Sequence, residues 1–445
     1  MTVTYKYADD LAPLSTEAAW QADREESRVV LPTGLEPLTL AWADAPAAEI
    51  LGAIIEELCP QASLVAATEL AAQALQTTWG KKAPLALTPA RGSLGTRFSE
   101  LGAGPTMTAA DWSTALVQDL AKSETPLSLV AHDPALLIAL AEKLLPGNHL
   151  TGFADLSRLA PLVQKQFLAT ALLDDVAPLS VDQTEDLVTL AGWQQERAHL
   201  QETVKAEQRY YVPVDGGQLA VILPQILDYF LIAQQAPDQD LTIVTATTDF
   251  SNIIAARYAQ LLGAPIKRLF VTLTDDHLLA QYQQGEQAAL PWATLKNLLR
   301  LAASFDGQAR DLTATWAQLS ATWQDWLQIE VVAEPAILRE IRRGQTQDQL
   351  TLGVTAAQAS AFVQAHQLKN AIVLSLADPF QTPEAILRGI TNRQDGKTDF
   401  EAVQILRQIV DLKVPRVLTH LKAKTLPTLP QVPAEEIVTQ LSENL

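Results

Sequence analysis

Residues 241–273 read LTIVTATTDFSNIIAARYAQLLGAPIKRLFVTL and alternate between the patterns of strand and helix. The β-rich run at 241–244 predicts a strand, the apolar spacing over 252–262 a helix, and residues 267–273 a second strand. The small polar turn Thr247-Thr248-Asp249-Phe250-Ser251 joins the first strand to the helix. In an α/β sheet, such a turn is where backbone N–H groups hold a phosphate group.

The same alternation extends from this unit in both directions. It predicts strands over 29–32, 127–130 and 371–374, and helices over 47–58, 66–77, 135–145, 161–173, 184–206, 219–235, 356–366 and 383–389. Strands separated by helices at this spacing indicate an α/β fold of mostly parallel strands with helices on both faces. Residues 425–433 are Pro-rich and predict an extended strap before a last helix from 434.

The composition is that of an acidic globular protein. The chain has 445 residues, 48% of them hydrophobic, and a formal charge of −19 at pH 7. The acidic excess argues against nucleic acid and membrane partners, because both surfaces would repel the chain. The most apolar stretch, 219–233, is too short to span a bilayer, and the first residues show no signal-peptide pattern. We therefore expect a cytoplasmic protein.

The residue types of metal and nucleophile sites are sparse. The single cysteine, Cys59, excludes an internal disulfide and Cys-based metal cages, and it is predicted to be a buried small hydrophobe. The histidines lack ligand spacing, and the H-E-x-x-H, G-x-x-x-x-G-K-[ST] and G-x-S-x-G motifs are absent. Asp275-Asp276 predicts a solvated turn, while Gly102-Ala103-Gly104 and Gly216-Gly217 are each weak phosphate-loop signals.

Two stretches around the central turn carry a family resemblance. Residues 246–251 stand where threonine synthases have P-[ST]-G-N-F-G, and Gly263-Ala264-Pro265-Ile266-Lys267 resembles their G-L-P-I-K. Weaker matches follow in order at 5–32, 161–167, 223–230 and 372–384. Over nearly its whole length, the chain thus resembles threonine synthase, a pyridoxal-phosphate (PLP) enzyme of fold type II.

The resemblance implies an organisation and a reaction. It implies two α/β domains with mostly parallel sheets around a central cleft. The expected segments are an N-terminal threonine-synthase-like α/β piece at 1–95, a small domain at 96–209, and a large domain with the C-terminal tail at 210–445. Threonine synthases are lyases of amino-acid biosynthesis that convert O-phosphohomoserine and water to threonine and phosphate. In these enzymes, a lysine forms a Schiff base with the cofactor.

The Schiff-base lysine is missing from the matching stretch. The family motif is G-P-T-x-x-F-K-D-F, and the register of Gly104-Pro105-Thr106 and Asp111-Trp112 places Ala110 at the lysine position. A methyl group cannot form an imine. The nearest lysines along the chain are Lys122 and the pair Lys81-Lys82, and Lys122 would lie about 18 Å further along a continuous helix.

The loops that would hold the cofactor and the substrate are also altered. Thr248 and Ser251 stand at the glycine positions of the phosphate loop, and Asp249, at the asparagine position, adds a charge that opposes a phosphate. The S-G-D-T-G substrate loop becomes Ala131-His132-Asp133-Pro134-Ala135, and Val221 replaces an arginine that would pair with the substrate. The Thr-Ala-His triplet near the pyridine ring becomes Leu376-Ala377-Asp378.

These replacements predict a threonine-synthase-like protein without that catalytic activity and with a binding or regulatory role. No cofactor is expected, and the partner would be a small molecule or a protein such as an active threonine synthase. One alternative is an active threonine synthase that uses PLP and another lysine. Another is a different chemistry in the same cleft, with His132, Asp133 and Asp249 as candidate residues.

Overall fold

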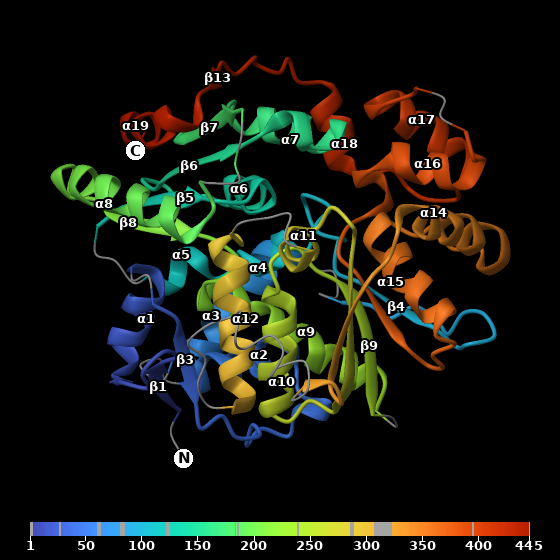
Figure 1. The fold of residues 1–445 in the computed structure, drawn as a ribbon, viewed down its shortest axis with the longest axis horizontal. Helices are drawn as coiled ribbons and strands as arrows, with labels where there is room; N and C mark the ends of the chain where they lie inside the picture. Colours follow the sequence, from blue (N-terminus) through green and yellow to red (C-terminus); the bar gives the residue numbers. More distant parts are fainter. Residues whose placement is uncertain are drawn as a thin grey trace.

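The computed structural model describes residues 3–25, 28–59, 64–80, 85–121, 125–182, 184, 187–237, 240–284, 289–306, 323–393 and 396–444. These residues form two five-stranded parallel sheets and a small three-stranded antiparallel sheet, with helices packed around them (Figure 1). The expected α/β class with mostly parallel strands is therefore confirmed. Lys81, Lys82 and Lys122 lie outside the described residues.

The larger parallel sheet is built around the unit at 241–273. Its strand order is β11 (Leu327–Val331), β10 (Ile266–Leu273), β9 (Leu241–Ala246), β12 (Ile372–Ser375) and β4 (Arg97–Glu100). Along β9, Ile243 packs into the core that holds α9 (Leu219–Gln235) and α10 (Ser251–Leu261). Its neighbour Val244 packs into the core of α15 (Val354–Ala365), because successive strand residues face opposite sides of a sheet. Helices therefore cover both faces, as predicted.

The second parallel sheet has the order β13 (Gln431–Val432), β7 (Val176–Val181), β6 (His149–Ala154), β5 (Leu127–Ala131) and β8 (Tyr210–Val214). Its helices are α6 (Pro134–Ala141), α7 (Pro161–Thr170) and α8 (Leu190–Ala206). α8 begins later than the helix predicted from 184, because the Thr189 side chain accepts a hydrogen bond from the Gly192 amide and caps it. The C-terminal strap adds β13 to the edge of this sheet beside β7 and ends in α19 (Ile437–Glu443), both at the top of Figure 1.

The N-terminal segment forms the antiparallel sheet of β2 (Pro13–Leu14), β1 (Thr4–Tyr7) and β3 (Val30–Thr33), with α1 (Thr16–Glu25) beside it. A buried charge cluster attaches this segment to α12 (Trp292–Asp306). The Asp23 carboxylate pairs with Lys296 at 3.0 Å and also with Arg300. The two cations outweigh the effect of burial and lower the pKa of Asp23.

Each of the segments expected at 96–209 and 210–445 contributes strands to both parallel sheets. β4 pairs with β12 in the larger sheet, whereas β8 pairs with β5 and β13 pairs with β7 in the other. Such pairings join strands far apart in the sequence, so local patterns do not reveal them.

The described residues also form the α-helices α2 (Ala47–Leu58), α3 (Leu64–Trp79), α4 (Ala110–Ser113), α5 (Val117–Leu120), α11 (Leu278–Gln284), α14 (Glu334–Arg343), α16 (Pro383–Thr391), α17 (Asp399–Ile409) and α18 (Arg416–Lys422).

The apolar stretch at 219–233 is the central helix, α9. Nearly all of its residues are buried, and it packs against α10, α2 and α4. Burial on all sides explains why this helix lacks a polar face. Among the described residues, no helix is long and apolar enough to cross a membrane. Cys59 is buried, and Asp275 and Asp276 are exposed in a turn, as predicted.

Candidate functional site

A cavity of about 270 Å³ lies where the carboxyl ends of the two parallel sheets meet, and we call it the cleft cavity. Its wall includes residues that directly follow strands β5, β8 and β9: His132, Asp133, Asp215, Gly216, Thr248 and Asp249. Trp193 from α8 and Trp292 from α12 complete much of the remaining wall. Ligands of parallel α/β proteins bind at such carboxyl ends. The predicted phosphate-loop and substrate-loop positions therefore do meet in one place.

The loop between β9 and α10 is held by its own side chains. Thr247 Oγ1 donates a hydrogen bond to Asn252 Oδ1 at 2.7 Å and accepts one from the Phe250 amide at 2.9 Å. Phe250 has a φ of 66°, a left-handed conformation that is uncommon outside glycine. Of the five predicted loop positions, only Thr248 and Asp249 line the cleft cavity. The Thr247 hydroxyl is thus already engaged within the loop.

The carboxylate of Asp249 lies at the N-terminus of α10. Its Oδ1 accepts a hydrogen bond from the amide of Ser251, the first helical residue, at 2.9 Å. The same carboxylate packs against Gly216, where an added Cβ would overlap Asp249 Oδ2. A helix N-terminus attracts anions because its amide groups lack partners. At α10, the chain supplies that anion itself.

The cleft cavity is acidic. Asp133, Asp215 and Asp249 all line it, and no lysine or arginine among the described residues does so. Burial raises the pKa of Asp249 to about 6, with the negative charges of Asp133 and Asp215 adding to the shift. Burial also raises the pKa of Asp133. Burial thus disfavours the ionised forms of Asp133 and Asp249, and a positive charge in the cavity would stabilise those forms.

His132 is held in the wall by a buried carboxylate. Its Nε2 lies 2.9 Å from Glu196 Oε2, and the Tyr211 hydroxyl donates to Glu196 Oε1 at 2.6 Å. Burial disfavours the charged imidazole, but the Glu196 carboxylate outweighs it, so the pKa of His132 is raised. Within the described part of the chain, His132 Nδ1 has no hydrogen-bond partner. The side chain is thus oriented through one nitrogen while the other remains without a partner.

Asn297 joins the two loops on either side of the cleft cavity. Its Nδ2 donates to the carbonyl oxygens of Gly216 and Asp249, each at 2.9 Å. This residue, with Asp215, Glu196, Trp193 and Trp292, was not singled out from the sequence. Among the sequence signals near these five residues was the Gly216-Gly217 pair, which directly follows Asp215. Asp215 directly follows β8, while the other four residues come from α8 and α12, and only packing brings those helices to the cleft.

Ala110 and Val221 lie away from the cleft cavity wall. Ala110 is the first residue of α4, and Val221 is buried within α9. Lys143 contacts the residue that follows Ala110, because its Nζ donates a hydrogen bond to the carbonyl oxygen of Asp111. Burial lowers the pKa of Lys143 to about 8. Lys296 approaches the cleft at Gly217, but its Nζ donates to the Asp23 carbonyl oxygen at 2.6 Å.

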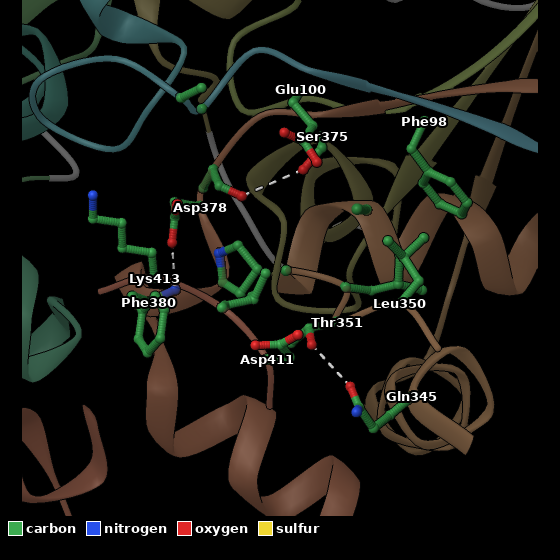
Figure 2. A pocket seen from close by; sticks show the side chains of 18 of the residues that line it. Phe98, Glu100, Gln345, Leu350, Thr351, Ser375, Asp378, Phe380, Asp411 and Lys413 are labelled. Carbon is green, nitrogen blue, oxygen red and sulfur yellow. Dashed lines mark hydrogen bonds between the residues drawn. The ribbon is translucent and has the colours of Figure 1, made fainter. Parts of the chain in front are cut away.

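A second cavity, of about 510 Å³, lies at the carboxyl ends of β4 and β12 (Figure 2). Ala377 and Asp378, from the altered Thr-Ala-His triplet, line this cavity and not the cleft cavity. Asp378 Oδ1 accepts a hydrogen bond from the Phe380 amide at 2.8 Å, which Figure 2 shows as a dashed line. Burial and the nearby Glu100 raise the pKa of Asp378 to about 6. The positions implied by the resemblance are therefore divided between two cavities.

Comparison with solved structures relates the whole chain to one group of enzymes. A PLP-bound threonine synthase from Brucella melitensis matches with a TM-score of 0.76 and 16% identity, over 100% of this chain and 99% of that one. The threonine synthase from Escherichia coli matches with a TM-score of 0.74 and 17% identity, over 99% of this chain and 100% of that one. The chain has the threonine synthase fold.

The yeast threonine synthase is similar as well, with a TM-score of 0.72 and 16% identity over 99% of this chain and 98% of that one. At this level of identity, the likeness establishes the fold and not the activity. No protein-family model and no curated protein sequence matches the chain. Whether the threonine synthase chemistry is present therefore depends on the residues of the site.

The residues at the site do not fit PLP. Ala110 has no amine, and the Asp249 carboxylate is at the α10 N-terminus, where the resemblance would place the phosphate. The phosphate would also face Asp133 and Asp215, with no lysine or arginine from the described residues in the wall. At a separation of about 4 Å, two like charges repel each other by about 4 kcal/mol even at a moderate effective dielectric constant.

Proposed function

We propose that this protein does not catalyse the threonine synthase reaction and that its cleft cavity binds a small molecule other than PLP. One observation carries the proposal: the Asp249 carboxylate accepts a hydrogen bond from the Ser251 amide at the start of α10 and lies against Gly216, where the resemblance would place a phosphate. Ala110 supports it, because a Schiff base needs a primary amine. A protein partner such as an active threonine synthase stays a prediction from the sequence.

The geometry supports binding because the cavity walls are held in place. Asn297 joins the loops after β8 and β9, while Glu196 and Tyr211 fix His132. A fixed wall loses little conformational entropy when a ligand binds. Fold and catalytic site are separable, so a protein can keep the cleft of an enzyme fold after the reactive groups have changed.

The test is to incubate the purified protein with PLP and record its absorbance. We expect no imine band near ~420 nm, and no cofactor attached to the protein after borohydride reduction and mass spectrometry. An imine that borohydride fixes to a single lysine would overturn the proposal. A threonine synthase with its lysine intact, treated in parallel, serves as the positive control.

A working threonine synthase is the second candidate, and Lys143 is the observation that favours it. Its Nζ contacts the residue next to Ala110, and a pKa of about 8 leaves more of the amine neutral than usual at pH 7. Lys143→Met separates the two candidates. If Lys143 serves as a substitute, this variant loses both the imine and any threonine formation from O-phosphohomoserine. Under our proposal, neither protein forms the imine or the product.

A further inference from the structure

One segment near the C-terminus has the opposite charge to the rest of the chain. Over the whole sequence, 51 acidic residues outnumber 32 lysines and arginines, but residues 407–424 hold five lysines and arginines and one acidic residue, Asp411. These five side chains are exposed, and none of them forms an ion pair with another described residue. We call them the basic surface: Arg407, Lys413, Arg416, Lys422 and Lys424.

The helices around the basic surface do not neutralise it. Both α17 and α18 pack against α7, whose one charged residue, Lys165, pairs with Asp399 at 3.3 Å. Glu401, the other acidic residue of α17, pairs with Lys397. The acidic side chains of α17 are therefore already engaged, and the cations of the basic surface remain without a carboxylate partner in the described part of the chain.

The same segment exposes two large apolar side chains. Ile409 is 41% exposed and Leu412 is 39% exposed, and they are two of the six large hydrophobic residues exposed in the described part of the chain. Both line the second cavity, of about 510 Å³, together with Lys413 and Phe380. Figure 2 shows Lys413 and Phe380 on one side of this cavity and Leu350 on the other. Exposed apolar groups beside charged ones are typical of protein-binding surfaces.

The charge of the basic surface selects an acidic partner. Aspartate and glutamate carboxylates pair with lysine and arginine, and complementary charge orients such contacts. A nucleic acid or an anionic membrane fits less well, because its extended negative surface would also face the excess of acidic residues elsewhere on this chain. The cavity beside the cations further favours a polypeptide, whose apolar side chains can enter it.

We propose that the basic surface and the second cavity together bind an acidic segment of a partner protein. Carboxylates of this segment pair with the exposed cations, and a large apolar side chain enters the cavity against Ile409 and Leu412. Glu100, Asp378 and Asp411 also line the cavity, so the side chain that enters it is apolar while the carboxylates stay outside. The inference goes beyond the proposed function, because the second cavity shares no lining residue with the cleft cavity.

The test uses three fluorescein-labelled peptides of equal length. The first is acetyl-Glu-Glu-Glu-Leu-Glu-Phe-Glu-Glu, the second has lysine at every glutamate, and the third has serine in place of leucine and phenylalanine. Binding to the full-length protein is measured by fluorescence anisotropy at pH 7.5. We expect the first peptide to bind at least about tenfold more tightly than the second and about fivefold more tightly than the third. Added salt should weaken its binding severalfold, because salt screens exposed charges.

Equal binding of the first two peptides would overturn the inference. Vesicles that contain phosphatidylserine and a single-stranded oligothymidine are titrated in the same way. Tighter binding of either one than of the first peptide would refute the acidic protein segment as the occupant.

Three variants locate the binding surface, and circular dichroism checks that each is folded. Lys413→Glu combined with Arg416→Glu should weaken binding of the first peptide by at least about tenfold, because attraction becomes repulsion at two positions. Leu412→Ser should reduce the preference for the first peptide over the third. Lys369→Glu, at an exposed position outside the segment, is the matched control and should bind as the unaltered protein does. Unchanged binding in the double variant, or an equal loss in the control, would refute the location.

Discussion

The carboxylate of Asp249 makes the stability of this protein depend on pH in a direction that one substitution can test. Its pKa is about 6 in the folded protein, against an ordinary value of 3.8, chiefly because of burial. The folded state therefore holds this proton more tightly than the unfolded chain. Stability is lost as the pH rises from about 4 to about 6, where only the folded state still binds the proton.

The size of the effect follows from the two pKa values. The folded and unfolded pKa values of Asp249 differ by about two, and a pKa difference of one corresponds to about 1.4 kcal/mol. Ionised Asp249 therefore lowers the free energy of unfolding by about 3 kcal/mol at pH 8. At pH 5 the cost is about half of that, because the folded protein keeps most of the proton. Asp249→Asn keeps an acceptor for the Ser251 amide and removes the charge. It should therefore stabilise the protein by up to about 3 kcal/mol at pH 8 and about 1.5 kcal/mol at pH 5.

The assay is urea unfolding of both proteins at pH 5 and pH 8, followed by circular dichroism. Asp133, Asp215 and His277 are ionisable groups near Asp249, His132 lines the same cavity, and all four are unchanged in the variant. Asp44→Asn, at an exposed position in a short helix, is the control and should shift the unfolding free energy little at either pH. A variant that is destabilised at pH 8, or equally affected at both pH values, would contradict this account of a buried carboxylate among like charges.

Three further outcomes are expected. Asp23→Asn should destabilise the protein by about 3–5 kcal/mol in urea unfolding, because it leaves two buried cations without their carboxylate. A loss below about 1 kcal/mol would show that this charge cluster contributes little to stability. Asn297→Ala should destabilise the protein by about 1–3 kcal/mol in the same assay, because it releases both cleft loops. Ala110→Lys should release no phosphate from O-phosphohomoserine in a coupled phosphate assay, and restored turnover would show that the rest of the site is intact.

Much of the fold could be predicted because it follows from local periodicity. The strand–helix–strand unit at 241–273 appears as β9, α10 and β10 with boundaries shifted by one or two residues. The strand membership of the sheets could not be predicted in the same way. β4 and β8 each pair with strands far away in the sequence, and their hydrophobic pattern fits either sheet. Register between distant strands depends on packing that local patterns do not encode.

The same distinction between local pattern and tertiary packing applies to the residues of the candidate site. Sequence reasoning found His132, Asp133 and Asp249, because each stands in a loop with a recognisable motif. It missed Asp215 and Asn297, whose importance comes from their position beside those loops. It also grouped Val221 with the site, although this side chain is buried in α9 and does not line the cleft cavity.

The amino-acid sequence by itself determined the α/β class and the identity of Ala110 at the position matching the lysine motif, since both depend on neighbours along the chain. Only the tertiary structure decided that the carboxylate of Asp249 lies at the start of α10 and shares a cavity with Asp133 and Asp215. It also decided that Asp378 lines a different cavity. The physical reason is that electrostatic interactions depend on distance in space, and these carboxylates follow strands that are remote in sequence but meet at the carboxyl ends of two packed sheets.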